Sequence, residues 1–208
     1  TFILNKLLNE RYSTPDIYSL TSNIKSVKTT SFKESKIQTS FVQSLPFGKT
    51  NVQSYLPILP FAIEQFDLRE YDLIISSSHA IAKGVLTSPE QLHISYIHTP
   101  MRYAWDQMNT YLKNSTLSKF GFEVPIRFML YKLREWDFYS SQRLDYIIAN
   151  SNFTSKRIKK YWGLESDVIN PPVDIKRFRY NNPREDFYMS VNRLVPNKRI
   201  DLLIKAFN

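Results

Sequence analysis

The chain has 208 residues, of which 42% are hydrophobic and 14% aromatic, so it can build a proper core and is not a disordered protein. It contains no cysteine, which excludes disulfides, thiolate metal sites and cysteine nucleophiles and fits the reducing cytoplasm. A formal net charge of +9 favours anionic partners, namely nucleic acid, acidic lipid or phosphorylated ligands, without choosing between them.

Membrane-spanning and phosphate-cradling segments are not apparent in the sequence. No run approaches the roughly 18 apolar residues of a membrane span, and the N-terminus lacks the pattern of a signal peptide. Only four glycines occur, and none belongs to a glycine-rich phosphate loop. Both ends fall inside apparent helices without a cap or a stop signal, so we expect a piece of a longer cytoplasmic protein.

Along the chain, segments in which apolar residues have the spacing of a helix alternate with segments in which they have the pattern of a strand. The helical spacing predicts helices at 2–9, 37–45, 52–66 (kinked by Pro57 and Pro60), from about 80, at 122–140 and at 153–161. Apolar runs predict strands at 16–20, 71–75, 92–97, 145–149 and 167–170. A polar turn follows each strand of the central part. This alternation is typical of a doubly wound α/β fold.

The character of the sequence changes at Pro171 and Pro172, where a double proline gives a stiff extended connector. We expect a Rossmann-like N-terminal domain at 1–170 and a linker at 171–186. A second α/β domain then begins at 187–208, with a strand at 187–191 and a helix that reaches the end of the chain.

Asp137 falls within the apolar stripe of the helix expected at 122–140. A buried carboxylate needs a cation or several hydrogen-bond donors, so we predict that Asp137 is paired, with Arg102 as a speculative partner. The alternative is that Asp137 marks the solvent edge of the stripe.

Polar side chains gather where the predicted strands end. His98 follows the strand at 92–97, and Pro100 prevents a strand or helix from continuing through the turn. Ligands of open α/β sheets bind beyond the carboxyl ends of the strands, so His98 is a candidate contact, although a lone histidine at a strand end is more often a structural residue. Ser78 and His79 lie at the neighbouring strand end. His93, within its strand, is interpreted as structural, and the spacing of the three histidines does not suit a metal site.

Two groups of basic residues could bind anions. Arg193 and Lys198 flank the start of the last predicted helix, a geometry that suits a diphosphate, or they are surface residues beside a turn. A basic helix end next to Tyr161 and Trp162 could contact anionic lipid or nucleic acid, or be a solvated face whose aromatic rings tuck underneath. That helix end carries Lys156, Arg157, Lys159 and Lys160.

Together these segments resemble the family 4 glycosyltransferases, retaining enzymes with two facing Rossmann-like domains in the GT-B arrangement. Five motifs occur in the order of that family: YDLIISSSHA at 71–80, YIHTPMRYAWD at 96–106, ANS at 149–151, VINPPVD at 168–174 and VNRLVPNK at 191–198. The resemblance covers nearly all of the chain, and the ordered set is more specific than any single motif.

The resemblance implies a site in the cleft between the two domains. His98 would face the donor sugar as the catalytic residue, and Arg193 and Lys198 would bind the donor pyrophosphate. No metal is expected, because cations take the place of a metal-binding motif. The acceptor side or the cleft wall would be formed by Ser78, His79, Arg102, Asn150 and Ser151.

Three features depart from the family pattern. The glycine-rich loop after the first strand and the acidic Glu-x7-Glu segment of the second domain are not in this sequence, and Asn192 stands where many members have glycine. We therefore expect this fragment to be inactive alone.

The motif at 98–106 is similar to that of bacterial mannosyltransferases and related enzymes of surface-polysaccharide assembly. The implied donor is a nucleotide-diphosphate sugar, with GDP-mannose favoured, and the implied acceptor is a glycan or lipid-linked glycan. An anionic membrane surface is a further implied partner, and nucleic acid is not. The alternative is a non-catalytic protein of the same fold that binds nucleotide sugar or anionic lipid; a downstream Glu-x7-Glu segment would favour the enzyme.

Overall fold

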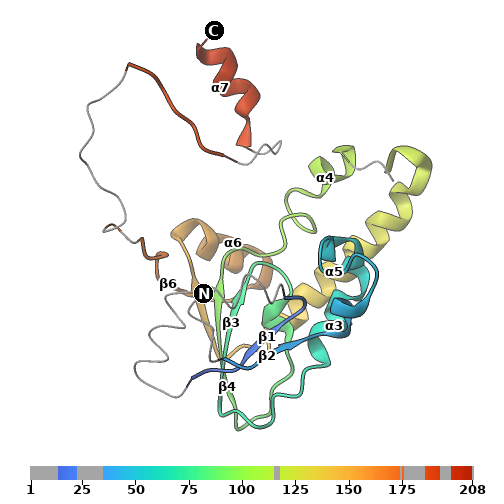
Figure 1. Cartoon of the computed structure of the whole chain (residues 1–208), viewed down its shortest axis with the longest axis vertical. Helices are drawn as coiled ribbons and strands as arrows, with labels where there is room; N and C mark the ends of the chain where they lie inside the picture. The colour runs from blue at the N-terminus through green and yellow to red at the C-terminus, as the bar shows by residue number, and fades with distance from the viewer. Residues whose placement is uncertain are drawn as a thin grey trace. The chain divides into compact units, whose positions relative to one another are not determined.

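The structure, a computed structural model, contains a four-stranded parallel sheet that is formed within residues 73–168 (Figure 1). The structure describes residues 14–22, 35–114, 118–173, 175, 186–192 and 198–207. The sheet order is β3 (Leu73–Ser78), β4 (Leu92–Ile97), β5 (Tyr146–Ala149) and β6 (Asp167–Val168). A separate two-stranded parallel sheet pairs β1 (Ile17–Ser19) with β2 (Ile37–Thr39). The predicted α/β class with a parallel sheet flanked by helices is confirmed.

Helices connect and cover the strands of the central sheet. The α-helices are α3 (Leu59–Glu64), α4 (Met108–Asn114), α5 (Glu123–Ser141), α6 (Asn152–Trp162) and α7 (Ile200–Phe207). Shorter helical turns are η1 (Phe41–Ser44), η2 (Val52–Ile58), η3 (Ala82–Gly84) and η4 (Ser118–Phe122). The helix predicted at 52–66 is present as η2 followed by α3, with Pro57 inside the first and Pro60 in the first turn of the second.

The chain divides into two compact units, Thr1–Pro172 and Val173–Asn208. The break falls at the start of the segment that the sequence predicts to be a linker. Within the second unit, the described residues 186–192 are not in a strand, so the strand predicted at 187–191 is wrong. A strand is held by hydrogen bonds to a neighbour, and among the described residues of this unit there is no second strand to pair with.

One face of the central sheet is largely buried. Because the strands are parallel and in register, Ser78 lies beside Ile97, and Ile97 beside Ala149. Ile97, Ile147 and Ala149 pack against Ile158 and Trp162 of α6 in one core cluster. Side chains of the opposite face, such as Tyr96, are only partly buried. Alternation along each strand therefore decides which polar residues are accessible.

The boundaries of α6 follow from the sequence around it. Ser151 has extended backbone angles, and its side-chain oxygen accepts a hydrogen bond from the backbone N–H of Thr154, as a helix N-cap does. At the other end Gly163 adopts φ 72°, a left-handed conformation that favours glycine and ends the helix. The predicted helix at 153–161 is confirmed to within one residue at each end.

Three predicted elements differ from the structure. The strand predicted at 71–75 begins at Leu73 and continues to Ser78, because the hydroxyl of Ser76 is satisfied by the side chains of His93 and Ser95 on β4. The helix predicted from residue 80 is only the short turn η3, after which Val85 returns to an extended conformation. The helical stripe predicted at 37–45 begins instead with β2, which pairs with β1, and is helical only in η1. The helix predicted at 2–9 lies outside the described residues.

Candidate functional site

The carboxyl ends of β3, β4 and β5 bring several predicted site residues to one edge of the sheet (Figure 1). The backbone N–H of His98 donates to the carbonyl of Ser78 at 2.8 Å. The backbone N–H of Asn150 donates to the carbonyl of Ile97 at 3.1 Å. These bonds extend the ladders by one residue and place His98 between the ends of its two neighbouring strands.

The side chain of His98 is exposed and lies on the less buried face of the sheet. Its Nε2 is 2.9 Å from Oγ of Ser77, and its ring packs edge-on against Tyr96 with the ring centroids 5.3 Å apart. Partial removal from water and the nearby charge of His79 lower the pKa of His98 below its ordinary value. The lowered pKa favours the neutral imidazole, which can exchange hydrogen bonds with hydroxyl groups.

Ser78 has a structural place. Its side chain is 2% exposed, and its Oγ accepts a hydrogen bond from the backbone N–H of Lys83 at 3.3 Å. Ser77, which the sequence reasoning did not select, is the serine that reaches His98. The signal was the strand register: once β3 extends through the three serines, Ser77 and Ser78 must point to opposite faces.

Asn150 and Ser151 hold the end of β5 together. The hydroxyl of Ser151 donates to Oδ1 of Asn150 at 3.0 Å and also caps α6. The backbone carbonyl of Asn150 accepts from Nδ2 of Asn170 at 3.2 Å. The first turn of α6 reaches the candidate histidine as well, since Oγ1 of Thr154 donates to the carbonyl of His98 at 3.2 Å. His79 is exposed beside this edge.

We call residues 98–106 the histidine turn. Most of its side chains are occupied by packing or pairing. Pro100, Met101 and Ala104 are buried. Thr99 accepts a hydrogen bond from Nη1 of Arg157, and Asp106 forms an ion pair with Nη2 of the same arginine. The turn is thus built as a rigid support, which leaves few of its side chains for a ligand.

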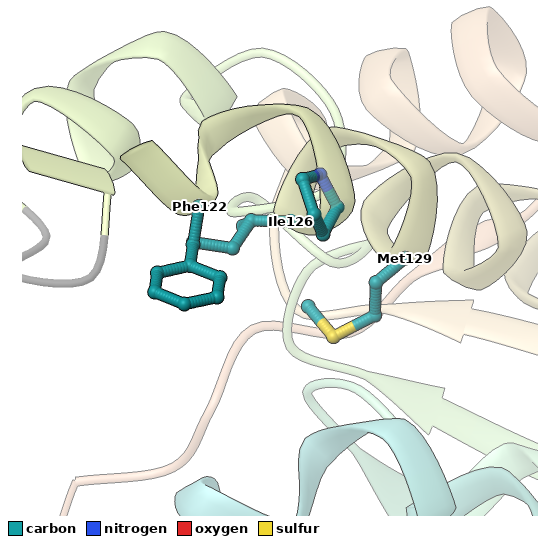
Figure 2. Close-up of a pocket in the computed structure, with 4 residues that line it drawn as sticks. Phe122, Ile126 and Met129 are labelled. Carbon is teal, nitrogen blue, oxygen red and sulfur yellow. The ribbon is translucent and has the colours of Figure 1, made fainter. Parts of the chain in front are cut away.

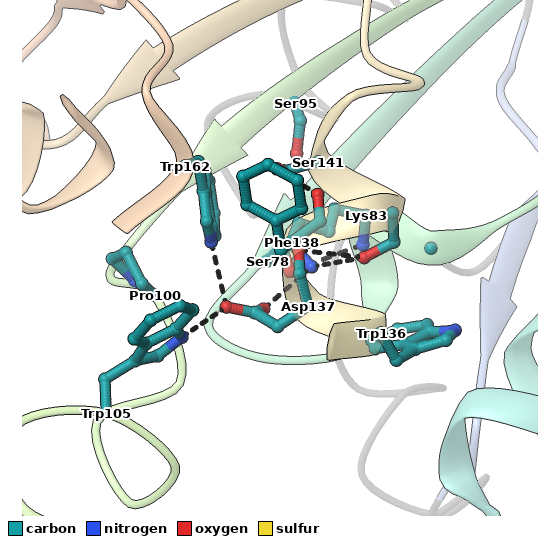
Figure 3. A network of polar contacts seen from close by, with 12 residues as sticks. Ser78, Lys83, Ser95, Pro100, Trp105, Trp136, Asp137, Phe138, Ser141 and Trp162 are labelled. Carbon is teal, nitrogen blue, oxygen red and sulfur yellow. Dashed lines mark hydrogen bonds and ion pairs between the residues drawn. The ribbon is translucent and has the colours of Figure 1, made fainter. Parts of the chain in front are cut away.

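Arg102 is one of the few side chains of the histidine turn that neither packing nor pairing occupies. Its Nε is buried and has no hydrogen-bond partner among the described residues. The speculative pairing of Arg102 with Asp137 is wrong. Asp137 is fully buried and forms its ion pair with Lys83, with Nζ 2.8 Å from Oδ1 (Figure 3). Lys83 is distant in sequence, and a lysine in a turn after a strand is ordinarily exposed, so the sequence does not indicate this partner.

His93 has the structural role expected from the sequence. Its ring is fully buried, with Nε2 2.9 Å from Oγ of Ser76. Its backbone N–H donates to Oδ2 of Asp145 at 2.7 Å. Burial lowers the pKa of His93 to about 4, so the ring is neutral in the folded chain.

Of the two predicted phosphate-binding residues, the structure describes only one. Lys198 is exposed in the second unit, just before α7. Arg193 lies outside the described residues. The basic pair therefore stays a prediction.

The basic end of α6 matches the alternative of a solvated helix face. Arg157 is tied to the histidine turn, and Lys159 pairs with Glu165. The aromatic rings are tucked underneath: Trp162 is buried, and Tyr161 stacks on Trp105 with ring centroids 4.7 Å apart. Lys156 and Lys160 of this helix are exposed and form no ion pair with the residues that the structure describes.

Two shallow hollows lie along α5. One, of about 250 Å³, is entirely apolar in its lining (Figure 2). It is lined by Phe122, Pro125, Ile126 and Met129. The other, of about 210 Å³, is lined by Trp105 of the histidine turn and by Tyr131, Arg134, Glu135, Phe138 and Tyr139.

In the part of the chain that the structure describes, no three His, Asp or Glu side chains gather closely enough to hold a metal ion. Nor does any described helix have the length and apolar character needed to cross a bilayer. Comparison with family models, with curated proteins and with solved structures found no match to the chain.

Proposed function

We propose that the chain is part of a retaining glycosyltransferase of the GT-B arrangement, which moves a hexose from a nucleotide-diphosphate sugar to a glycan or lipid-linked glycan. The observation that carries the proposal is the position of His98. Its exposed, neutral imidazole stands at the end of β4, beside Ser77, on a turn whose other side chains are largely buried or paired. The ordered motifs of the sequence support the same assignment.

In this proposal the imidazole positions the sugar and the basic residues act on the leaving group. A neutral histidine exchanges hydrogen bonds with sugar hydroxyls without a cost for burying a charge. Arg193 and Lys198 stabilise the negative charge that builds on the departing nucleoside diphosphate. Arg102, whose side chain is only partly buried in the same turn, contributes its guanidinium group as a donor to an anionic or hydroxylated group of the acceptor.

The choice of a lipid-linked acceptor has support in the exposed apolar side chains of η4 and of the first turns of α5. Phe120, Phe122, Val124 and Phe128 are all more than half exposed. A surface of this kind, in a chain with a net charge of +9, suits a peripheral position at an anionic membrane. GDP-mannose is the donor we favour, from the motif resemblance alone.

The test is a transfer assay with the product of the complete gene and a panel of nucleotide sugars that includes GDP-mannose. We expect Arg193→Ala to lower kcat/KM by roughly 100-fold and His98→Ala by roughly 10- to 100-fold, because each removes an interaction at the reacting centre. Lys160→Ala, which removes an exposed charge on α6, is the matched control. Its kcat/KM should equal that of the parent. Activity within a few-fold of the parent in both site variants would overturn the site assignment. Absence of transfer from every donor would favour the non-catalytic binding protein.

A further inference from the structure

Asp137 is the meeting point of four segments that are far apart in the sequence (Figure 3). It lies on α5 and is 0% exposed. Its Oδ1 is 2.8 Å from Nζ of Lys83, which follows β3. Its Oδ2 accepts hydrogen bonds from two indole N–H groups, that of Trp105 at 2.8 Å and that of Trp162 at 2.9 Å.

The charge of Asp137 is enclosed from several sides. Lys83, which is 1% exposed, also donates to Oγ of Ser140 at 2.7 Å. Its Nζ lies 4.8 Å from the ring centroid of Trp136 and 5.1 Å from that of Trp162. Removal from water lowers the pKa of Lys83, and the carboxylate of Asp137 opposes that effect. Because one cation and two hydrogen-bond donors satisfy the carboxylate, its side chain is held in a single conformation.

Only one of the two indole bonds reaches the candidate site. Trp105 is part of the histidine turn, whereas Trp162 is at the far end of α6 from the sheet edge. Around Trp105 the backbone is already fixed, since its own N–H donates to the carbonyl of Met101 at 3.1 Å and the carbonyl of Ala104 accepts from Arg134 at 2.8 Å. The indole bond adds a link from the turn to the buried ion pair.

We infer that Asp137 is a positioning residue: through the indole of Trp105 it sets the conformation of the histidine turn, and so the orientation of His98. Only the expected effect of Asp137 on catalysis rests on the proposed function. The placement of His98 by Trp105 and Asp137 is a separate physical claim that can be measured without substrate.

The structure supplies a matched pair of variants. Trp105→Phe and Trp162→Phe each remove one N–H donor from the same oxygen of Asp137 and each keep an aromatic ring in place. Both should lose similar thermal stability, because both leave the carboxylate with one donor fewer. They differ in whether the lost bond belongs to the turn that carries His98.

The first readout is the NMR signal of the His98 imidazole, which is recorded during a pH titration. The signal is assigned by its absence in His98→Ala. We expect Trp105→Phe to move its chemical shift and to raise its pKa toward the ordinary value of about 6.5, while Trp162→Phe leaves both unchanged. Equal changes in the two variants, or none in either, would overturn the inference. If Trp105→Phe does not fold, hydrogen exchange of the parent decides: the indole N–H of Trp105 should exchange as slowly as that of Trp162, and rapid exchange would contradict the bond.

The second readout is transfer activity of the complete gene product. Trp105→Phe should lower kcat by roughly 10- to 100-fold with little change in KM, because a misplaced reacting group costs rate more than binding. The kcat of Trp162→Phe should stay within about two-fold of the parent value. If the parent itself transfers no sugar, the proposed function fails while the NMR result still decides the role of Asp137.

Discussion

The hydroxyl of Ser77 lies 2.9 Å from Nε2 of His98, across the ends of two neighbouring strands. Ser78, the next residue, points the opposite way and supports the turn at Lys83 from inside the fold. Two adjacent serines therefore serve different purposes, and substitution can separate them.

We predict opposite consequences for these two serines. Ser77→Ala should lower kcat/KM by about 2- to 10-fold, the value of one hydrogen bond, and leave the melting temperature nearly unchanged. Ser78→Ala should reduce the free energy of unfolding by about 1 kcal/mol, because a buried backbone N–H loses its acceptor, with little effect on activity. Kinetics and thermal unfolding of both variants check this. The reverse pattern would show that Ser78 is the functional serine.

The buried ion pair gives a prediction about stability. Asp137→Ala should cost about 3–5 kcal/mol, because it leaves Lys83 buried without a counter-charge and two indole N–H groups without an acceptor. The double change Lys83→Met with Asp137→Leu should recover a large part of that loss, since a buried pair replaced by apolar side chains is often tolerated. Denaturant unfolding of Lys83→Met, of Asp137→Leu and of the double variant measures the coupling. A double variant whose loss equals the sum of the single losses would mean that the two residues are not coupled.

The buried ring of His93 predicts a loss of stability in acid. Its pKa falls from an ordinary value of 6.5 to about 4 on folding, so the unfolded chain binds a proton more readily. The contribution is fully present above pH 6.5, is lost progressively as the pH falls toward 4, and changes no further below that. Its size is at most between about 3 and 4 kcal/mol, at about 1.4 kcal/mol for each pKa unit. Urea unfolding between pH 7 and 4 measures it. His93→Gln is the control, and an equally steep fall in that variant would assign the effect to other groups.

Arg102 should show a conflict between stability and binding. Its buried Nε has no partner among the described residues, so Arg102→Met should leave the free energy of unfolding unchanged or raise it by up to about 1 kcal/mol. In the proposed function the guanidinium group of Arg102 donates to the acceptor, so the same change should raise KM for the acceptor by about 10-fold. Lys156→Met, which removes an exposed cation on α6, is the matched control. A clear loss of stability in Arg102→Met would mean that the arginine has a structural partner.

The sequence predicted the elements whose periodicity is strong. The strand at 92–97 and the helices represented by α5 and α6 have the expected positions, because apolar spacing over a long or well-capped segment leaves little choice. Periodicity failed for short segments. Ile37 belongs to β2 because it pairs with Ile17, and that pairing depends on the fold and not on the local pattern.

The site was predictable to the level of the sheet edge and no further. The rule for parallel sheets placed His98, His79 and Asn150 together from the sequence alone. The partner of Asp137 was not predictable, because a long-range contact between Lys83 and α5 has no local signature. The choice between Ser77 and Ser78 required the end of β3, and strand ends are the least certain feature of such predictions.

The arrangement around Asp137 also determines what the optical spectrum of this protein reports. The chain contains three tryptophans. Two of them donate their indole N–H to Asp137, and the ring of the third, Trp136, lies beside the ammonium group of Lys83. All intrinsic tryptophan fluorescence therefore arises around one buried ion pair. Emission from this molecule is a local probe of the surroundings of that pair, and a change in it marks an event at the support of the histidine turn before it marks unfolding elsewhere.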